Sequence, residues 1–193
     1  YRPDGSLGSS WHSWLRDGQI QLPIQEDETA LVLDALWKHY LQHNDPSYIK
    51  KLFKIFVRPA ANFMLKHIDE KTGLPKESYD LWEEKLGIHT FTCSTVYAGF
   101  LAAANFEDEF GTVTKAKVLR QAAERLKQAM LKHLYDEQLG YFIKMVYYEN
   151  GEMKRDTTLD FSSAYSIFQF DVLPVTDERV TKSMESRKQR LNC

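Results

Sequence analysis

The chain contains six stretches in which apolar residues recur with the spacing of an α-helix. In the first stretch Ala30, Leu33 and Leu36 fall on one face, which predicts a helix with one side packed on a core. The third stretch, "FTCSTVYAGFLAAA", is apolar nearly all round, which indicates burial on every side. We predict helices over residues 27–43, 46–67, 90–105, 114–134, 158–170 and 177–191.

Two local signals mark a helix start and a connection between helices. Asp45 followed by Pro46 is typical of a helix start, because Asp caps free N–H groups and proline fits the first turn. Between the fourth and fifth predicted helices, "YFIKMVYYENGEMKRD" has β-rich flanks around Glu-Asn-Gly-Glu. Asn-Gly favours a two-residue turn, so this stretch predicts a β-hairpin.

An internal repeat indicates how the helices are arranged. "MLKHIDEKTGLP", from Met64 to Pro75, returns 66 residues later as "MLKHLYDEQLGYF", from Met130 to Phe142. Each copy ends an amphipathic helix and is followed by a long loop and a more uniformly apolar helix. A period of this length is typical of helical-hairpin arrays, and the loops are too long for a simple bundle. The fold class we predict is all-α, as part of a two-layered helical toroid with the apolar helices inside and a small β-hairpin in one long loop.

Polar residues gather just before the predicted inner helices. These stretches are residues 25–28, residues 82–84 with His89, and residues 155–156 with Asp160. If the inner helices run parallel, their N-termini meet at one face, so the acidic and polar groups would line one rim. Helix N-termini also tolerate acids as caps. Asp27 and Asp160 therefore remain open between sugar contact and helix capping.

Composition excludes few functions. The net charge of −2 gives no reason to expect nucleic acid or an anionic membrane as a partner. No apolar run approaches the roughly 20 residues that a membrane helix needs. The aromatic content of 13% suits a carbohydrate site and a large core equally well. Two cysteines do not make a disulfide framework, and Cys93 is predicted to be a buried thiol.

The remaining candidate sites carry less weight. His39 and His43 stand one helical turn apart, but no HExxH motif or third ligand accompanies them, so we predict no metal. No phosphate-binding glycine loop is present, and we expect no cofactor. His67 and His133 end the two repeated helices, where a cation suits the helix dipole. His89 is open between a hydrogen bond near the site and a capping role.

Three segments resemble one enzyme family. "LPKESYDLWEEKLGIHTFT", "RPDGS…LPIQEDETALVLDALWKHY" and "FDVLPVTDERV" are similar to the glucoamylase family, family 15 of the glycoside hydrolases. The resemblance implies an (α/α)6 barrel of six inner and six outer helices. It also implies an inverting hydrolase that releases β-glucose from the non-reducing ends of α-glucosides such as α-glucan oligosaccharides.

The resemblance assigns roles to the Trp-Glu-Glu motif. Glu83 matches the general acid, Glu84 matches a glutamate that hydrogen-bonds substrate, and Trp82 is the indole beside them. A general acid must be protonated near neutral pH, and an adjacent indole and a nearby ionised carboxylate both favour that form. From the rim we add three further expected substrate contacts, namely Gln25, Asp27 and Arg155.

The sequence also departs from the family pattern. Gln21 stands where many members have a tryptophan, and "WLRDG", from Trp14 to Gly18, is interpreted as a turn. An inverting glycosidase needs a second carboxylate about 6.5–9.5 Å from the acid. In the family this base lies beyond the position of Cys193, so we expect residues 1–193 to be an incomplete catalytic domain. Alone, they should be inactive and could self-associate through open toroid faces. The alternative is a non-catalytic carbohydrate-binding or regulatory fragment that retains the fold.

Overall fold

The computed structural model describes residues 14–16, 19–21, 24–82 and 84–191, and these are mostly helical. Short antiparallel strands connect the helices. The helices are α1 (Glu26–His43), α2 (Pro46–Leu52), a π-helical segment (Phe53–Val57), α3 (Arg58–His67), α4 (Thr90–Phe110), α5 (Val113–His133), α6 (Phe161–Gln169) and α7 (Glu178–Leu191). The strands are β1 (Trp14–Arg16), β2 (Gln19–Gln21), β3 (Ser78–Tyr79), β4 (Leu86–His89), β5 (Tyr135–Asp136), β6 (Tyr141–Phe142), β7 (Met145–Glu149) and β8 (Glu152–Asp156).

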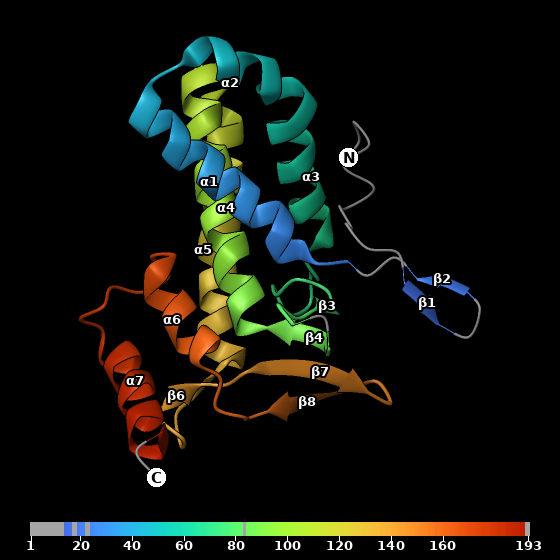
Figure 1. Cartoon of the computed structure of the whole chain (residues 1–193), viewed down its shortest axis with the longest axis vertical. Helices are drawn as coiled ribbons and strands as arrows, with labels where there is room; N and C mark the ends of the chain where they lie inside the picture. Colours follow the sequence, from blue (N-terminus) through green and yellow to red (C-terminus); the bar gives the residue numbers. More distant parts are fainter. Residues whose placement is uncertain (1–13, 17–18, 22–23, 83, 192–193) are drawn as a thin grey trace.

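The centre of the molecule is α4, which contacts α1, α5 and α6 (Figure 1). In α4, 15 of the 21 residues are buried, as its uniformly apolar sequence predicts. The outer helix α5 is amphipathic instead, and it buries a stripe that includes Leu119 and Leu126. Gly99 permits the close crossing of α1, because a Cβ at this position would lie 3.1 Å from the Cα of Ala30. The prediction of a buried apolar helix beside an amphipathic one is therefore confirmed for α4 and α5.

The predicted helix over residues 46–67 is interrupted by the π-helical segment. Asp45 caps α2 as expected, accepting hydrogen bonds from the backbone N–H groups of Ser47 and Tyr48. Pro59 has no N–H to donate and crowds the preceding turn. The backbone N–H of Arg58 accordingly donates to the oxygen of Phe53, five residues earlier. The wider π turn accommodates the proline within a continuous helical path.

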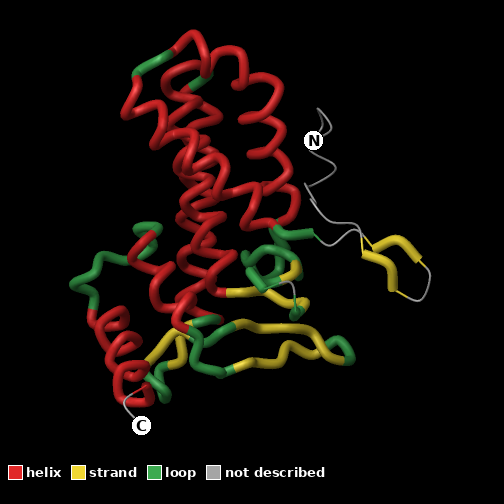
Figure 2. The backbone as a smooth tube through the Cα atoms, viewed as in Figure 1, coloured by secondary structure: helices red, strands yellow, loops and turns green. Residues whose placement is uncertain are grey.

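The strands β3, β4, β7 and β8 form one antiparallel sheet in that order, at one end of the helices (Figure 2). The predicted hairpin is the pair β7–β8. Its turn residues Asn150 and Gly151 have φ values of 53° and 80°. Two consecutive residues with positive φ are the signature of the type I′ turn that Asn-Gly favours. This prediction is confirmed.

Several predicted boundaries differ from the structure. The third helix continues to Phe110, and the fifth begins only at Phe161, because Asp160 caps it. Within "WLRDG", residues Trp14–Arg16 form a strand paired with β2, and the rest of the motif lies outside the described residues. In the described part of the chain, no helix combines the length and the apolar character needed to cross a membrane.

Candidate active site

The segment Asp80–Lys85, here called the acid loop, connects β3 to β4 and is closed by one buried side chain. The backbone N–H of Asp80 donates to the oxygen of Lys85 at 3.0 Å. The Oδ1 of Asp80 accepts the backbone N–H groups of Glu84 at 2.7 Å and Lys85 at 3.2 Å. Asp80 itself is 3% exposed, whereas Trp82 is 63% exposed. The acid loop is thus anchored by the buried carboxylate of Asp80, whereas Trp82 in the same loop is exposed to solvent. Glu83, the predicted general acid, lies outside the described residues.

The N-terminus of α1 holds the start of the acid loop. The side-chain Nε2 of Gln25 donates to the backbone oxygen of Asp80 at 3.3 Å. The backbone N–H of Tyr79 donates to the oxygen of Ile24 at 2.9 Å. Gln25 occupies the cap position of α1 but makes no capping hydrogen bond with its side chain. Its buried amide instead ties α1 to the loop.

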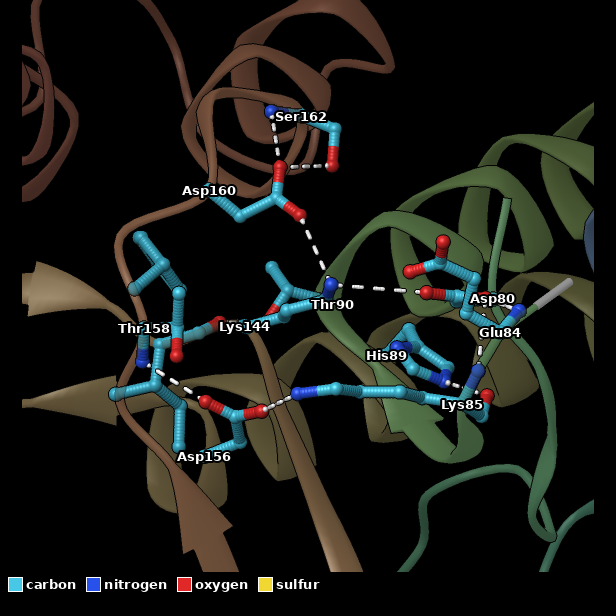
Figure 3. Close-up of polar contacts among 12 residues, drawn as sticks. Asp80, Glu84, Lys85, His89, Thr90, Lys144, Asp156, Thr158, Asp160 and Ser162 are labelled. Carbon is cyan, nitrogen blue, oxygen red and sulfur yellow. Dashed lines mark hydrogen bonds and ion pairs between the residues drawn. The ribbon is translucent and has the colours of Figure 1, made fainter. Parts of the chain in front are cut away.

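Lys144 connects the acid loop to α6 (Figure 3). Its Nζ lies 3.6 Å from the Oδ2 of Asp80 and 3.7 Å from the Oδ2 of Asp160. Asp160 caps α6, because its Oδ1 accepts the backbone N–H of Ser162 at 2.8 Å. The capping alternative for Asp160 is therefore confirmed. The acid loop and the N-terminus of α6 meet at one lysine.

A small pocket opens between these groups. Its volume is about 10 Å³, close to the space of a single water molecule. Charged and hydroxyl groups make up much of its wall, and Trp82 is among the residues that line it. The lining residues are Asp80, Leu81, Trp82, His89, Phe91, Lys144, Asp160, Ser162 and Ser163.

The hairpin contributes an ion pair beside the loop. The Nζ of Lys85 donates to the Oδ2 of Asp156 at 2.8 Å. Burial alone would raise the pKa of Asp156, but its hydrogen bonds with Lys85 and Thr158 outweigh that effect and lower the pKa to about 2. The Nε2 of His89 lies 3.1 Å from the oxygen of Lys85, and its side chain makes no capping bond to α4. Of the two alternatives for His89, the structure therefore supports the hydrogen bond near the site.

Two carboxyl groups in the first turn of α1 are buried. Burial raises the pKa of Asp27 to about 6, and the charges of Glu28 and Asp80 act in the same direction. Its Oδ1 accepts the backbone N–H of Glu28 at 3.1 Å. Burial also raises the pKa of Glu26 well above its ordinary value, followed by the effect of Asp27. The side-chain oxygens of Glu26 have no hydrogen-bond partner among the described residues.

The predicted substrate contacts are distributed unevenly around this site. Trp82 lines the pocket, the backbone of Glu84 bonds to Asp80, and Gln25 bonds to the same loop. Arg155 is engaged elsewhere, with its Nη1 2.9 Å from the Oδ2 of Asp136. Among the described residues no group of three or more His, Cys, Asp or Glu side chains is placed to hold a metal ion.

Sequence reasoning missed two groups, Asp80 and Lys144. Asp80 belongs to the quoted motif, and an aspartate that opens a short loop is a recognisable signal for a side chain that accepts backbone N–H groups. Lys144 has no local signal. Its position depends on the pairing of β4 with β7, in which His89 lies opposite Met145.

Comparison with known proteins places this arrangement in a family. The sequence profile of the glycosyl hydrolases family 15 matches residues 16–186. An uncharacterized glycosyl hydrolase of Methanocaldococcus jannaschii is 27% identical over 179 residues, which cover 90% of this chain and 27% of that protein. The chain therefore spans about a quarter of the length of this curated relative.

Solved structures show the same fold at lower sequence identity. A rhamnosidase from Klebsiella oxytoca with rhamnose bound is 17% identical with a TM-score of 0.69, covering 98% of this chain and 35% of that chain. A bacterial glucoamylase complexed with acarbose is 17% identical with a TM-score of 0.67, covering 87% of this chain and 25% of that chain. Since the family profile covers most of the sequence, the chain belongs to family 15 of the glycosyl hydrolases.

Proposed function

We propose that the polypeptide in which these residues occur is an inverting, exo-acting α-glucoside hydrolase, with Glu83 as its general acid. The observation that carries the proposal is the acid loop, which is closed on Asp80 and held between α1 and α6. General acid catalysis needs a proton donor kept within hydrogen-bond reach of the leaving oxygen. A loop anchored on both sides by buried polar groups is suited to present one. Membership of family 15 supports hydrolysis of a glycosidic bond.

The groups beside Glu83 have matching roles in this proposal. The exposed indole of Trp82 offers an apolar face on which a sugar ring can stack. The carboxylate of Glu84, on the same exposed loop, accepts a hydroxyl of the substrate. Gln25 and Asp27 act from α1, Gln25 by holding the loop and Asp27 as a buried carboxyl beside it. Arg155, paired with Asp136, has the weakest support as a substrate contact.

The second half of the reaction is assigned to residues beyond this chain. A base that activates water is required about 6.5–9.5 Å from the acid. In the closed (α/α)6 toroid that we propose, further helices carry this base and complete the wall of the site. They would also cover Phe161 and Tyr165 on α6, which are 55% and 37% exposed.

Substitution of Glu83 by Gln in that polypeptide tests the proposal. Gln keeps the shape and removes the proton donor, so glucose release from an α-glucoside should fall by about 10²–10⁴-fold. Maltose, isomaltose and trehalose serve as the substrates, and NMR should show that the glucose unit attacked at its anomeric carbon is first released as the β-anomer. Glu84→Gln should instead raise KM together with a loss in kcat. Glu109→Gln is the matched control, because Glu109 is exposed near the C-terminus of α4.

Full activity of Glu83→Gln on these substrates would overturn the assignment of the acid. Binding of maltose without any glucose release by the unsubstituted polypeptide would favour the alternative, a carbohydrate-binding or regulatory protein that retains the fold.

A further inference from the structure

The main chain of Lys144 is held in place by two neighbouring elements. Its carbonyl oxygen accepts the backbone N–H of Thr90, the first residue of α4, at 3.0 Å. Its own N–H donates to the oxygen of Asp156, the last residue of β8, at 3.1 Å. The hydroxyl of Thr90 also donates to the oxygen of Ile143 at 2.6 Å. The lysine side chain therefore leaves a backbone that is tied to both α4 and the sheet.

The two carboxylates that face Lys144 are used in the same way. In Asp80, Oδ1 accepts two backbone N–H groups of the acid loop, and Oδ2 faces the lysine. In Asp160, Oδ1 accepts the backbone N–H and the hydroxyl of Ser162, and Oδ2 faces the lysine. In each carboxylate, one oxygen thus accepts hydrogen bonds from its own loop or helix end, and the other oxygen faces the ammonium of Lys144 (Figure 3).

Among the described residues, the neighbouring cations Lys85 and Arg187 have partners of their own. Lys85 donates to Asp156, and Arg187 donates to the backbone oxygens of Asp160, Ser183 and Phe142. His89 faces both carboxylates and Lys144, and burial lowers its pKa. The Oδ2 of Asp80 is buried and has no hydrogen-bond partner among the described residues. The ammonium of Lys144, whose side chain is 14% exposed, is then the cation at 3.6 Å that compensates it.

We propose that Lys144 is a positioning residue of the active site, whose ammonium holds the acid loop against the N-terminus of α6. This role rests on the proposed function, in which the loop carries the general acid. Removal of the ammonium leaves a buried carboxylate without a counter-charge, which is unfavourable. The carboxylate of Asp80 would then turn toward solvent, and this movement weakens the two N–H bonds that close the loop. A shift of about 1 Å in a catalytic group can reduce the rate about 10²-fold.

A first experiment measures the loop itself, without reference to activity. In Lys144→Met the aliphatic stem is kept and the charge is lost. Hydrogen exchange resolved to single amides should be roughly tenfold faster at Glu84 and Lys85, and unchanged in the middle of α5. Lys144→Arg should restore slow exchange, because it keeps the cation. Lys154→Met is the matched control, since Lys154 lies on the hairpin that follows Lys144 and pairs with exposed Glu152. Unchanged exchange at Glu84 and Lys85 in Lys144→Met would overturn the proposal.

A second experiment separates positioning of the acid from a general loss of structure. Fluoride leaves with little need for a proton, so hydrolysis of α-glucosyl fluoride depends weakly on the general acid. For Lys144→Met we expect kcat on maltose to fall about 10²-fold while kcat on α-glucosyl fluoride changes little. Equal losses on both substrates would contradict the positioning role. If the unsubstituted polypeptide hydrolyses neither substrate, the proposed function is wrong, and the exchange comparison still decides whether Lys144 holds the loop.

Discussion

The loops that follow α3 and α5 have the same pattern of backbone hydrogen bonds, although the histidines before them lie in different surroundings. The N–H of Gly73 donates to the oxygen of Asp69, and the N–H of Gly140 donates to the oxygen of Asp136, at 2.8 and 2.7 Å. The two glycines have φ values of 75° and 74°. The internal repeat in the sequence is therefore a repeat of local structure.

The difference lies in what packs against each copy. His67 stacks on Phe63 and is 13% exposed, with its Nε2 3.9 Å from the Oε2 of Glu26 in α1. Burial lowers the pKa of His67 to about 4. The expectation that this histidine complements the helix dipole as a cation is wrong, because burial favours its neutral form. His133 is partly exposed, and burial and Lys132 lower its pKa as well. The repeated residues determine the backbone conformation of each loop, and the elements packed around each histidine determine its burial and its pKa.

The first expected effect concerns the pH dependence of stability at His67. Its pKa is lower in the folded protein than in the unfolded chain, so the unfolded chain binds more protons between pH 6.5 and about 4. The contribution of His67 to the free energy of unfolding is fully present above pH 6.5. It is lost as the pH falls to about 4, and the loss can reach about 3 kcal/mol. Denaturant unfolding of His67→Leu should show that this part of the acid destabilisation has disappeared.

His133→Leu is the matched variant from the second copy. It should leave most of the acid destabilisation in place, because His133 is less buried. Equal pH profiles for the two variants would contradict the difference between the copies.

The next effect has the opposite sign and concerns Glu26. Its pKa is raised on folding, so above pH 4.5 the folded protein binds more protons than the unfolded chain and stability falls as the pH rises. Glu26→Gln removes this fall. Relative to the unsubstituted protein, it should gain about 1.4 kcal/mol for each pH unit above 4.5 over which Glu26 stays protonated when folded. The measurement is the free energy of unfolding at pH 4, 6 and 8, and a constant difference would show that Glu26 ionises normally.

The parts of the fold that local signals control were predictable. The uniformly apolar α4, the capped start of α2 and the Asn150–Gly151 hairpin all follow from residues within a few positions of each other. The π-helical segment before Pro59 follows from the same physics, but the periodicity of apolar residues is too coarse to reveal it.

The site was only partly predictable, because it depends on contacts between distant segments. The motif around Glu83 directed attention to the two glutamates, while the described loop is organised by Asp80. Lys144 reaches Asp80 only because β7 pairs with β4, and no feature of the sequence near Lys144 indicates that pairing. Likewise, the contact between Glu26 and His67 arises where α1 crosses the end of α3.

The smallest expected effect compares the two loop glycines directly. Both have positive φ, where an alanine costs roughly 1–2 kcal/mol. At Gly140 a Cβ would meet nothing within 4 Å, so Gly140→Ala should show this backbone cost alone. At Gly73 a Cβ would lie 3.3 Å from the Cβ of Ala129, so α5 must also shift by a few tenths of an ångström. Denaturant unfolding of both variants at pH 7 should therefore find Gly73→Ala the less stable by a fraction of 1 kcal/mol. When Gly73→Ala is introduced into the Ala129→Gly variant, its cost in stability should fall to nearly that of Gly140→Ala, because the crowding Cβ is gone. Equal losses for the two single variants would mean that the first loop is not packed on α5 as the structure shows.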